Sequence, residues 1–105
     1  MRKIVENYSD SDYWYRKYDD GLIEQGGKLL KTWSTDETYA FTFPRPFSST
    51  PLYMLTTVIN PRSGGDSYGN EFGVKTGTLS STGVSILSDE YNTGKQGFYW
   101  EAAGY

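Results

Sequence analysis

The sequence predicts an all-β protein, an antiparallel β-sandwich of about six to seven strands. Apolar and polar residues alternate with the two-residue period of a strand, most clearly near the end of the chain, where Phe98, Trp100 and Ala102 share one face. Twelve glycines are spread along the chain and indicate many turns. The predicted strands recur at the short spacing that is typical of a sandwich.

Composition narrows the class further. A chain of 105 residues is long enough for one domain with a core and too short for two. The absence of Cys and His excludes disulfides, thiol nucleophiles, zinc sites built on these residues and a Ser-His-Asp triad, and we expect no metal site and no cofactor. A net charge of −3 with mixed signs argues against a nucleic-acid partner. No apolar run reaches the roughly 18 residues of a membrane span, so we expect no membrane insertion.

The first half of the chain begins with a polar segment, residues 1–12, which we expect to be a flexible N-terminal segment or the end of a stalk. The single domain is predicted to span residues 13–105. Its first strand is residues 13–18, followed by an Asp-Asp-Gly turn and a returning strand at residues 22–25. The two glycines after it indicate a bulge or bend, and residues 28–33 continue beyond them as a strand or a short, weak helix.

The second half of the chain reads as strands separated by turns and two polar loops. A run that is apolar on both faces, residues 52–59, indicates a strand that is central in a sheet or lies at a subunit interface. The remaining strands are predicted at residues 39–43, 72–79, 84–87 and 98–105. The two polar loops are residues 60–70 and 88–97.

The order of these pieces resembles the small C-terminal domains of bacteriophage and prophage tail fibres, whose sandwich is akin to the H-type lectins. An aromatic first strand, the Asp-Gly turn with Leu-Ile, a Gln-Gly step, a mid-chain Phe-Pro and the terminal Trp strand closing in Ala-Ala-Gly-Tyr carry the resemblance. Gly26 departs from it, because the family pattern has Trp there. Trp33 is one candidate to replace the packing of that ring.

The resemblance implies a homotrimer at the distal tip of a fibre, part of a virion tail that is made in the bacterial cytoplasm. Its implied role is host adhesion, by non-covalent binding of a bacterial surface glycan and without enzymatic activity. Avidity agrees with this, because three linked sites can raise weak affinity by factors of about 10² to 10⁴. Two alternatives are a structural trimerisation or end-cap domain that binds nothing and a small glycan-cleaving enzyme.

A sugar-binding site needs an aromatic face for the ring and fixed polar groups for the hydroxyls. The two polar loops contain both, and loops held on a rigid scaffold are common binding surfaces. Of the three tryptophans, Trp33, beside a polar loop, is the best candidate for partial exposure, whereas Trp14 and Trp100 are expected in the core. The predicted ligand contacts are Arg62, Asp66, Tyr68, Asn70, Asp89, Tyr91, Asn92 and Trp33.

A glycan-cleaving enzyme would need two carboxylates roughly 5 to 10 Å apart across a cleft. Asp19 and Asp20 are better explained by their turn, and Asp89 and Glu90 are sequence neighbours in a loop. We therefore predict no catalytic residues. Turnover that depended on Asp66, Asp89 and Glu90 would support the enzyme instead.

Overall fold

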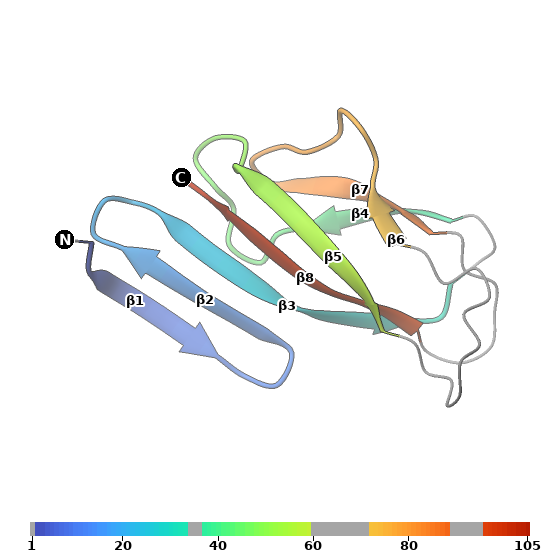
Figure 1. Cartoon of the computed structure of the whole chain (residues 1–105), viewed down its shortest axis with the longest axis horizontal. Coiled ribbons are helices and arrows are strands. Elements are labelled where there is room, and N and C mark those ends of the chain that lie inside the picture. The colour runs from blue at the N-terminus through green and yellow to red at the C-terminus, as the bar shows by residue number, and fades with distance from the viewer. Residues whose placement is uncertain (1, 34–36, 60–71, 89–95) are drawn as a thin grey trace.

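The computed structural model describes residues 2–33, 37–59, 72–88 and 96–105, and in them the chain forms two antiparallel sheets (Figure 1). A five-stranded sheet has the order β1-β2-β3-β8-β5 and a three-stranded sheet the order β4-β7-β6. The strands are β1 (Ile4–Ser9), β2 (Tyr13–Tyr18), β3 (Ile23–Lys31), β4 (Thr38–Thr42), β5 (Tyr53–Ile59), β6 (Phe72–Val74), β7 (Gly83–Ser88) and β8 (Gln96–Gly104). The predicted β-sandwich is confirmed.

The core lies between the two sheets. The terminal residues form a strand, as their alternation predicts; this strand, β8, runs between β3 and β5 and directs Phe98 and Trp100 at the three-stranded sheet. Phe98 is completely buried, and its ring lies 6.1 Å from that of Phe41 on β4 and 5.5 Å from that of Phe72 on β6. Burial of these rings is the main source of stability, because each removes a large apolar surface from water.

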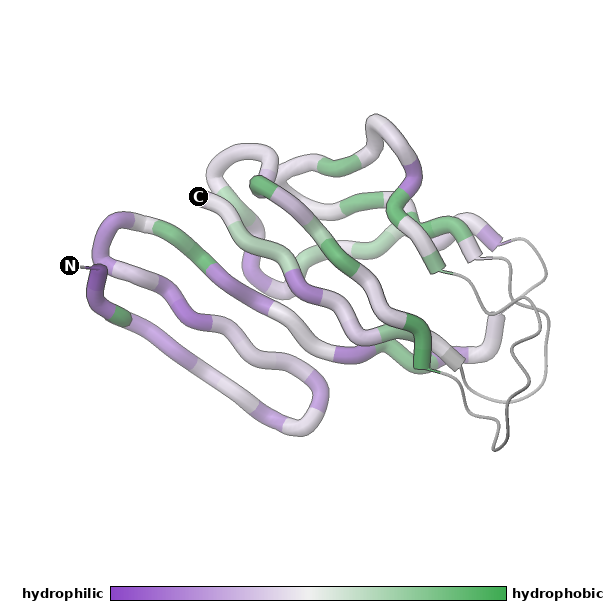
Figure 2. Tube along the Cα trace, in the orientation of Figure 1, coloured by the Kyte–Doolittle hydropathy of each residue, from purple (hydrophilic) through white to green (hydrophobic). Residues whose placement is uncertain are grey.

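The N-terminal segment, which we expected to be flexible or the end of a stalk, contains a strand. Residues 4–9 form β1, which pairs with β2 as a hairpin at one side of the five-stranded sheet (Figure 1). All six residues of β1 are exposed, so their sequence shows no alternation that would reveal a strand. The polar colouring of this hairpin contrasts with the apolar strands of the sandwich in Figure 2.

Strand β3 differs from the prediction in two ways. It continues without a helix through Lys31, and its register with β2 and β8 shows no bulge at Gly26 or Gly27. The glycines are needed for space instead. A Cβ at Gly26 would lie 2.8 Å from the indole of Trp14, and one at Gly27 would lie 2.2 Å from the carbonyl oxygen of Asp12.

Trp14, rather than Trp33, therefore fills the position over Gly26. Trp14 is directly opposite Gly26 in the register of β2 and β3, and its ring lies on the outward face of the sheet, half-buried. The expectation that Trp14 belongs to the core is wrong, whereas Trp100 is in the core as expected.

Strand β5 is at the edge of the five-stranded sheet and is not buried on both faces. Met54 is buried, but Leu52 and Leu55 are 72% and 60% exposed. Among the described strands β5 has a neighbour on one side only, so it is not central, and the alternative of a subunit interface is left. Strand β6 is likewise shorter than predicted, because it ends at Val74, before a turn in which Gly77 has a φ of 80°.

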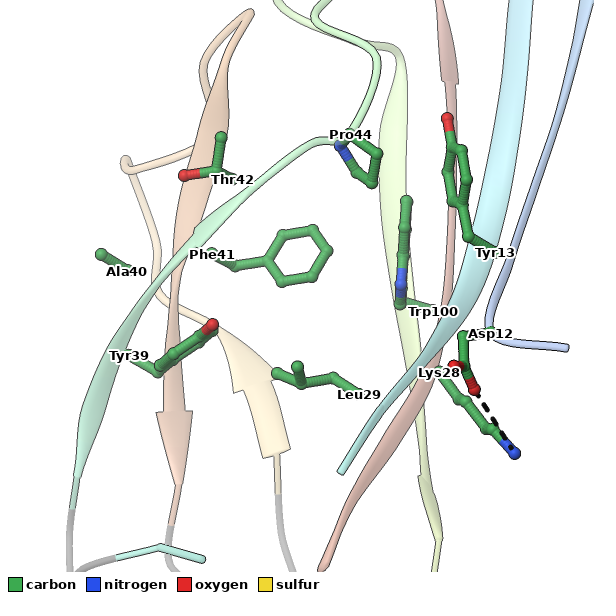
Figure 3. A pocket seen from close by; sticks show the side chains of 10 residues that line it. All are labelled: Asp12, Tyr13, Lys28, Leu29, Tyr39, Ala40, Phe41, Thr42, Pro44 and Trp100. Atoms are coloured by element: carbon green, nitrogen blue, oxygen red, sulfur yellow. Dashed lines mark ion pairs between the residues drawn. The ribbon is translucent and has the colours of Figure 1, made fainter. Parts of the chain in front are cut away.

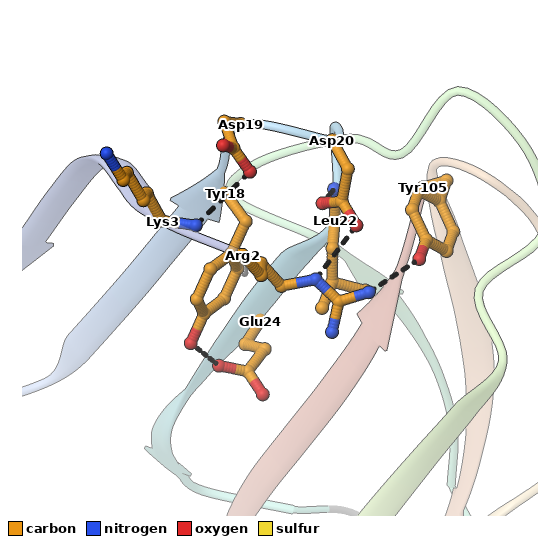
Figure 4. Close-up of polar contacts among 8 residues, drawn as sticks. All are labelled: Arg2, Lys3, Tyr18, Asp19, Asp20, Leu22, Glu24 and Tyr105. Atoms are coloured by element: carbon orange, nitrogen blue, oxygen red, sulfur yellow. Dashed lines mark hydrogen bonds and ion pairs between the residues drawn. The ribbon is translucent and has the colours of Figure 1, made fainter.

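The two ends of the chain meet beside the predicted Asp-Gly turn (Figure 4). Gly21 has a φ of 93°, which suits glycine, and Asp20 accepts hydrogen bonds from the backbone of Leu22 and from Arg2 Nε at 3.1 and 2.8 Å. Arg2 also donates to the hydroxyl of Tyr105 at 3.2 Å. Asp19 accepts the backbone N–H of Lys3 at 3.2 Å, so the carboxylate of Asp20 serves the turn and that of Asp19 holds the N-terminal segment beside it.

Candidate functional site

A hollow of about 330 Å³ opens where the hairpin meets the sandwich, and we call it the rim hollow (Figure 3). Strands β2, β3, β4 and β8 supply most of its walls. Its lining residues are Asp12, Tyr13, Lys28, Leu29, Tyr39, Ala40, Phe41, Thr42, Pro44 and Trp100. It exists because the three-stranded sheet covers only part of the five-stranded sheet and ends before the hairpin (Figure 1).

One side of the rim hollow is aromatic. The rings of Tyr13 and Trp100 lie 6.3 Å apart and 19° from parallel. Phe41 approaches Trp100 edge-on, at 4.9 Å and 69°, and Figure 3 shows the Phe41 and Leu29 side chains projecting into the hollow. Apolar walls of this kind suit the C–H face of a sugar or another flat apolar group.

A charged pair lines the mouth of the rim hollow at the edge of β3, where the Lys28 side chain points to the outward face of the sheet, away from Leu29 (Figure 3). Lys28 Nζ lies 3.8 Å from Asp12 Oδ1, and the two side chains are 36% and 71% exposed. This pair is long for an ion pair and open to solvent, so it contributes little to stability. Both groups can still exchange hydrogen bonds with a ligand, Lys28 as donor and Asp12 as acceptor.

The turn that carries Asp12 is built by Asp10. One Asp10 carboxylate oxygen accepts the backbone N–H groups of Asp12 and Tyr13 at 2.7 and 2.9 Å, and the other accepts the hydroxyl of Tyr8 at 2.7 Å. The Tyr8 hydroxyl and these backbone donors lower the pKa of Asp10 and keep it charged. The side chain thereby holds the edge of the rim hollow in place.

Tyr13 is held from the other side by Gln25, which is fully buried on β3. The Tyr13 hydroxyl lies 3.3 Å from Gln25 Oε1, and burial raises the pKa of Tyr13 to about 12. Gln25 Nε2 donates to the carbonyl of Arg45 at 2.7 Å, and the Arg45 N–H donates back to Gln25 Oε1 at 3.2 Å. One amide thus fixes both the Tyr13 ring and the segment that follows β4.

Of the predicted ligand contacts, only Trp33 lies in the described part of the chain, and its expected exposure is wrong. Trp33 is 5% exposed and packs against Phe72 with ring centroids 4.9 Å apart. Lys31 Nζ lies 3.9 Å from its ring centroid and also bonds Glu37 at 2.6 Å. The structure therefore places Trp33 in the core under an ion pair.

The other predicted contacts lie outside the described residues: Arg62, Asp66, Tyr68, Asn70, Asp89, Tyr91 and Asn92. The same holds for the carboxylate of Glu90. The described strand ends that flank the two loops do lie together, because Ile59 pairs with Gly97, and Phe72 pairs with Ser88. These residues remain predicted ligand contacts.

The sequence analysis missed the rim hollow because its residues come from strands far apart in the chain. A local signal did exist in the Asp-Ser-Asp turn followed by Tyr13, which is typical of a hairpin turn. Within the described residues, no group of three or more Asp or Glu side chains is placed to hold a metal ion. Those residues also contain no helix long and apolar enough to cross a membrane.

Comparison with protein families gives a match over residues 17–105 to the family described as "Putative tail fiber protein gp53-like, C-terminal". None of the curated proteins matches the chain significantly. The family match begins inside β2 and so leaves out β1.

Solved structures of tail fibres share the fold. An N-truncated R1-type pyocin tail fibre is 26% identical with a TM-score of 0.70, over 95% of this chain and 84% of that one. An R1 pyocin fibre fragment from P. aeruginosa is also 26% identical, with a TM-score of 0.67 over 95% of this chain and 28% of that chain. A P. aeruginosa R2 pyocin fibre, 21% identical over 95% of this chain and 25% of its own, shares the fold with a TM-score of 0.70. The chain therefore belongs to the gp53-like tail fibre family and is a tail fibre C-terminal domain of phage or pyocin type.

Proposed function

We propose that this domain is the receptor-binding tip of its fibre and binds a bacterial surface glycan non-covalently in the rim hollow. The observation that carries the proposal is the combination of the near-parallel Tyr13 and Trp100 rings with the Asp12–Lys28 pair at the mouth. A sugar ring has an apolar face and a hydroxyl edge, and this hollow has a partner for each.

The site is suited to binding rather than to cleavage. Of the lining residues only Asp12 carries a carboxylate, whereas glycoside hydrolysis ordinarily uses two, one of them with a raised pKa. Asp10 is nearby, but its pKa is lowered and its oxygens bond Tyr8 and the turn backbone. We therefore propose adhesion without turnover.

The affinity of one such site is expected to be weak. A few hydrogen bonds contribute about 0.5–1.5 kcal/mol each, and one stacked face adds to them. Once the costs of association are included, we expect a binding free energy of about −4 kcal/mol, which corresponds to a dissociation constant near the millimolar level. A homotrimer would overcome this by avidity. The predicted loop contacts, Tyr68 and Tyr91 among them, remain part of the proposal and would add contact area to the site.

The trimer is supported by the exposed apolar residues of β5. Leu55 points outward beside Glu101 and Leu52 precedes the strand, and neither is covered within the described chain. An edge strand with exposed apolar side chains is a common contact between subunits. We expect light scattering to give the parent chain a solution mass of three chains, and we expect Leu55→Asp to lower that mass to one chain. A parent chain with the mass of a monomer would contradict the trimer.

The glycan site is tested by labelling bacterial cells with the fluorescent domain and comparing two variants. Lys28→Met removes the donor at the mouth, and Leu29→Trp fills the hollow with a larger ring. Both are expected to weaken labelling about tenfold or more. For Lys28→Met the reason is the lost hydrogen bond from a charged donor, which contributes about 1.5–3 kcal/mol, and for Leu29→Trp it is the space that the larger ring takes from the ligand.

Lys75→Met is the matched control, because Lys75 is exposed just after β6, on the other sheet. Thermal unfolding of each variant checks that it folds. Labelling that both variants leave unchanged would overturn the rim hollow as the site. If Tyr68→Ala and Tyr91→Ala also left labelling unchanged, the alternative of a structural end cap would be favoured.

A further inference from the structure

A second, smaller hollow of about 150 Å³ lies beside the first, and we call it the outer hollow. Its lining includes Trp14, Lys28 and Tyr99, whose positions in the strands place them on the outward face of the five-stranded sheet. The rim hollow, with Leu29 and Trp100, lies on the inward face. The two hollows share Asp12, Tyr13 and Lys28.

The shared residues lie at a step in the edge of the sheet. Strand β2 begins at Tyr13, opposite Gly27, and the turn reaches one residue further, where the Lys28 N–H donates to the carbonyl of Asp12 at 3.0 Å. Beyond that point β3 continues to Lys31 with β8 on one side and no described strand on the other. A ligand can therefore pass from one face to the other at this step, beside the Asp12–Lys28 pair.

The outer hollow has the same kinds of groups as the rim hollow. Tyr99 is 55% exposed and lies directly opposite Lys28, and the Trp14 ring lies over Gly26. An exposed tyrosine ring next to a charged pair is a surface that binds the apolar face of a sugar while the pair bonds its hydroxyls.

The charges at the step favour a neutral ligand. Lys28 is the only cation that lines either hollow, and it faces Asp12, with the charged carboxylate of Asp10 in the same turn. Arg16 lies near Trp14, with its guanidinium carbon 4.8 Å from the ring centroid, but it pairs with Glu24 at 3.2 Å. An anionic group would therefore meet at least as much negative charge as positive charge.

We propose that the ligand is a chain of neutral sugars that crosses the step, with one residue in the rim hollow and another in the outer hollow. The proposal rests on the proposed glycan function and adds to it the length of the ligand and a second subsite. The Asp12–Lys28 pair then lies beside the linkage between the two sugars.

The test uses oligosaccharides of one to eight residues, released from the surface polysaccharide of a strain that the domain labels and separated by size. Their affinities are measured by calorimetry for the parent domain, Tyr99→Ala and Leu29→Trp. We expect Tyr99→Ala to weaken fragments of two or more sugars about tenfold and to leave single sugars unchanged, because it removes a stacked face from the outer hollow only.

Tyr53→Ala is the matched control. Tyr53 is the first residue of β5, on the same outward face as Tyr99, and it lines neither hollow. If Leu29→Trp abolishes binding but Tyr99→Ala has no effect at any length, the outer subsite is overturned and the rim hollow stands. If Tyr99→Ala weakens single sugars as much as long fragments, the crossing chain is overturned. If neither variant changes the affinity at any length, the glycan site itself is wrong.

Discussion

In the hairpin of β1 and β2 and in the sandwich that it joins, side chains point to alternate faces of the sheet in the same way, but with different results. In the sandwich, inward residues such as Phe98 meet a second sheet and are fully buried. In the hairpin, the inward side carries Tyr8, Tyr13 and Tyr15, whose ring centroids lie 6.0–6.2 Å apart, and the second sheet does not reach it. Alternation thus determines which side a residue faces, and the neighbouring sheet determines whether that side is dry.

The hairpin is held by polar contacts instead. The hydroxyl of Tyr15 lies 3.3 Å from Glu6, and the guanidinium of Arg45 lies over the Tyr15 ring at 4.4 Å. Tyrosine suits a half-wet surface, since its ring packs while its hydroxyl stays bonded. The hairpin can therefore form the edge of an open hollow, which a closed core could not.

The largest expected effect separates the two regions. Phe98→Ala should lower the free energy of unfolding by about 3–5 kcal/mol, because it leaves a cavity in a core that cannot collapse around it. Tyr15→Ala in the hairpin should cost only about 0.5–1.5 kcal/mol. Chemical denaturation of both variants measures the difference, and equal losses would show that the hairpin is as tightly packed as the sandwich.

The next effect concerns the join between the regions. Gln25→Leu should cost about 2–3 kcal/mol, because it leaves the backbone N–H and C=O of Arg45 without their buried partner. Arg45→Ala keeps that backbone and removes only exposed side-chain contacts, so it should cost less than about 1 kcal/mol. If Arg45→Ala proved the more costly of the two in denaturation, the side chain rather than the buried amide would join the hairpin to the sandwich.

A smaller effect concerns the chain ends in acid. The backbone N–H of Leu22, aided by Arg2, holds the pKa of Asp20 below its usual 3.8. The stabilisation is therefore present above about pH 4 and is lost as the pH falls through the lowered pKa. Asp20→Asn should lose less stability between neutral and acidic pH than the parent chain, as followed by thermal unfolding across pH. An identical acid profile would contradict the role of this carboxylate.

The smallest expected effect concerns Tyr13, at the boundary between the hairpin and the sandwich. Burial raises the pKa of Tyr13 to about 12, so Tyr13 should ionise in the late part of an ultraviolet titration, and Tyr13→Phe should reduce that late part by one tyrosine. The stabilisation is fully present below the ordinary tyrosine pKa of about 10 and is lost as the pH rises through about 12. A Tyr13 that titrated with the exposed tyrosines would mean that the rim hollow is wetter than its geometry indicates.

Much of the sandwich could be predicted from local sequence. The aromatic alternation around Phe98 and Trp100, the Asp-Gly turn at Gly21 and the strand at residues 39–43 each depend on neighbours in the chain, and all are confirmed. Strand β1 could not be predicted in this way, because a strand exposed on both faces has no apolar period.

The sequence by itself determined the class, the Asp-Gly turn and the strand character of the terminal residues, because alternation and glycine conformation are local properties. Only the tertiary structure decided which aromatics are dry and which line a hollow. Trp33 is next to a polar loop in the sequence but is covered by β4, β6 and Lys31, whereas Tyr13 lines the rim hollow because the second sheet ends beside it. Burial depends on where the second sheet ends, and that edge is made by contacts between residues far apart in the chain.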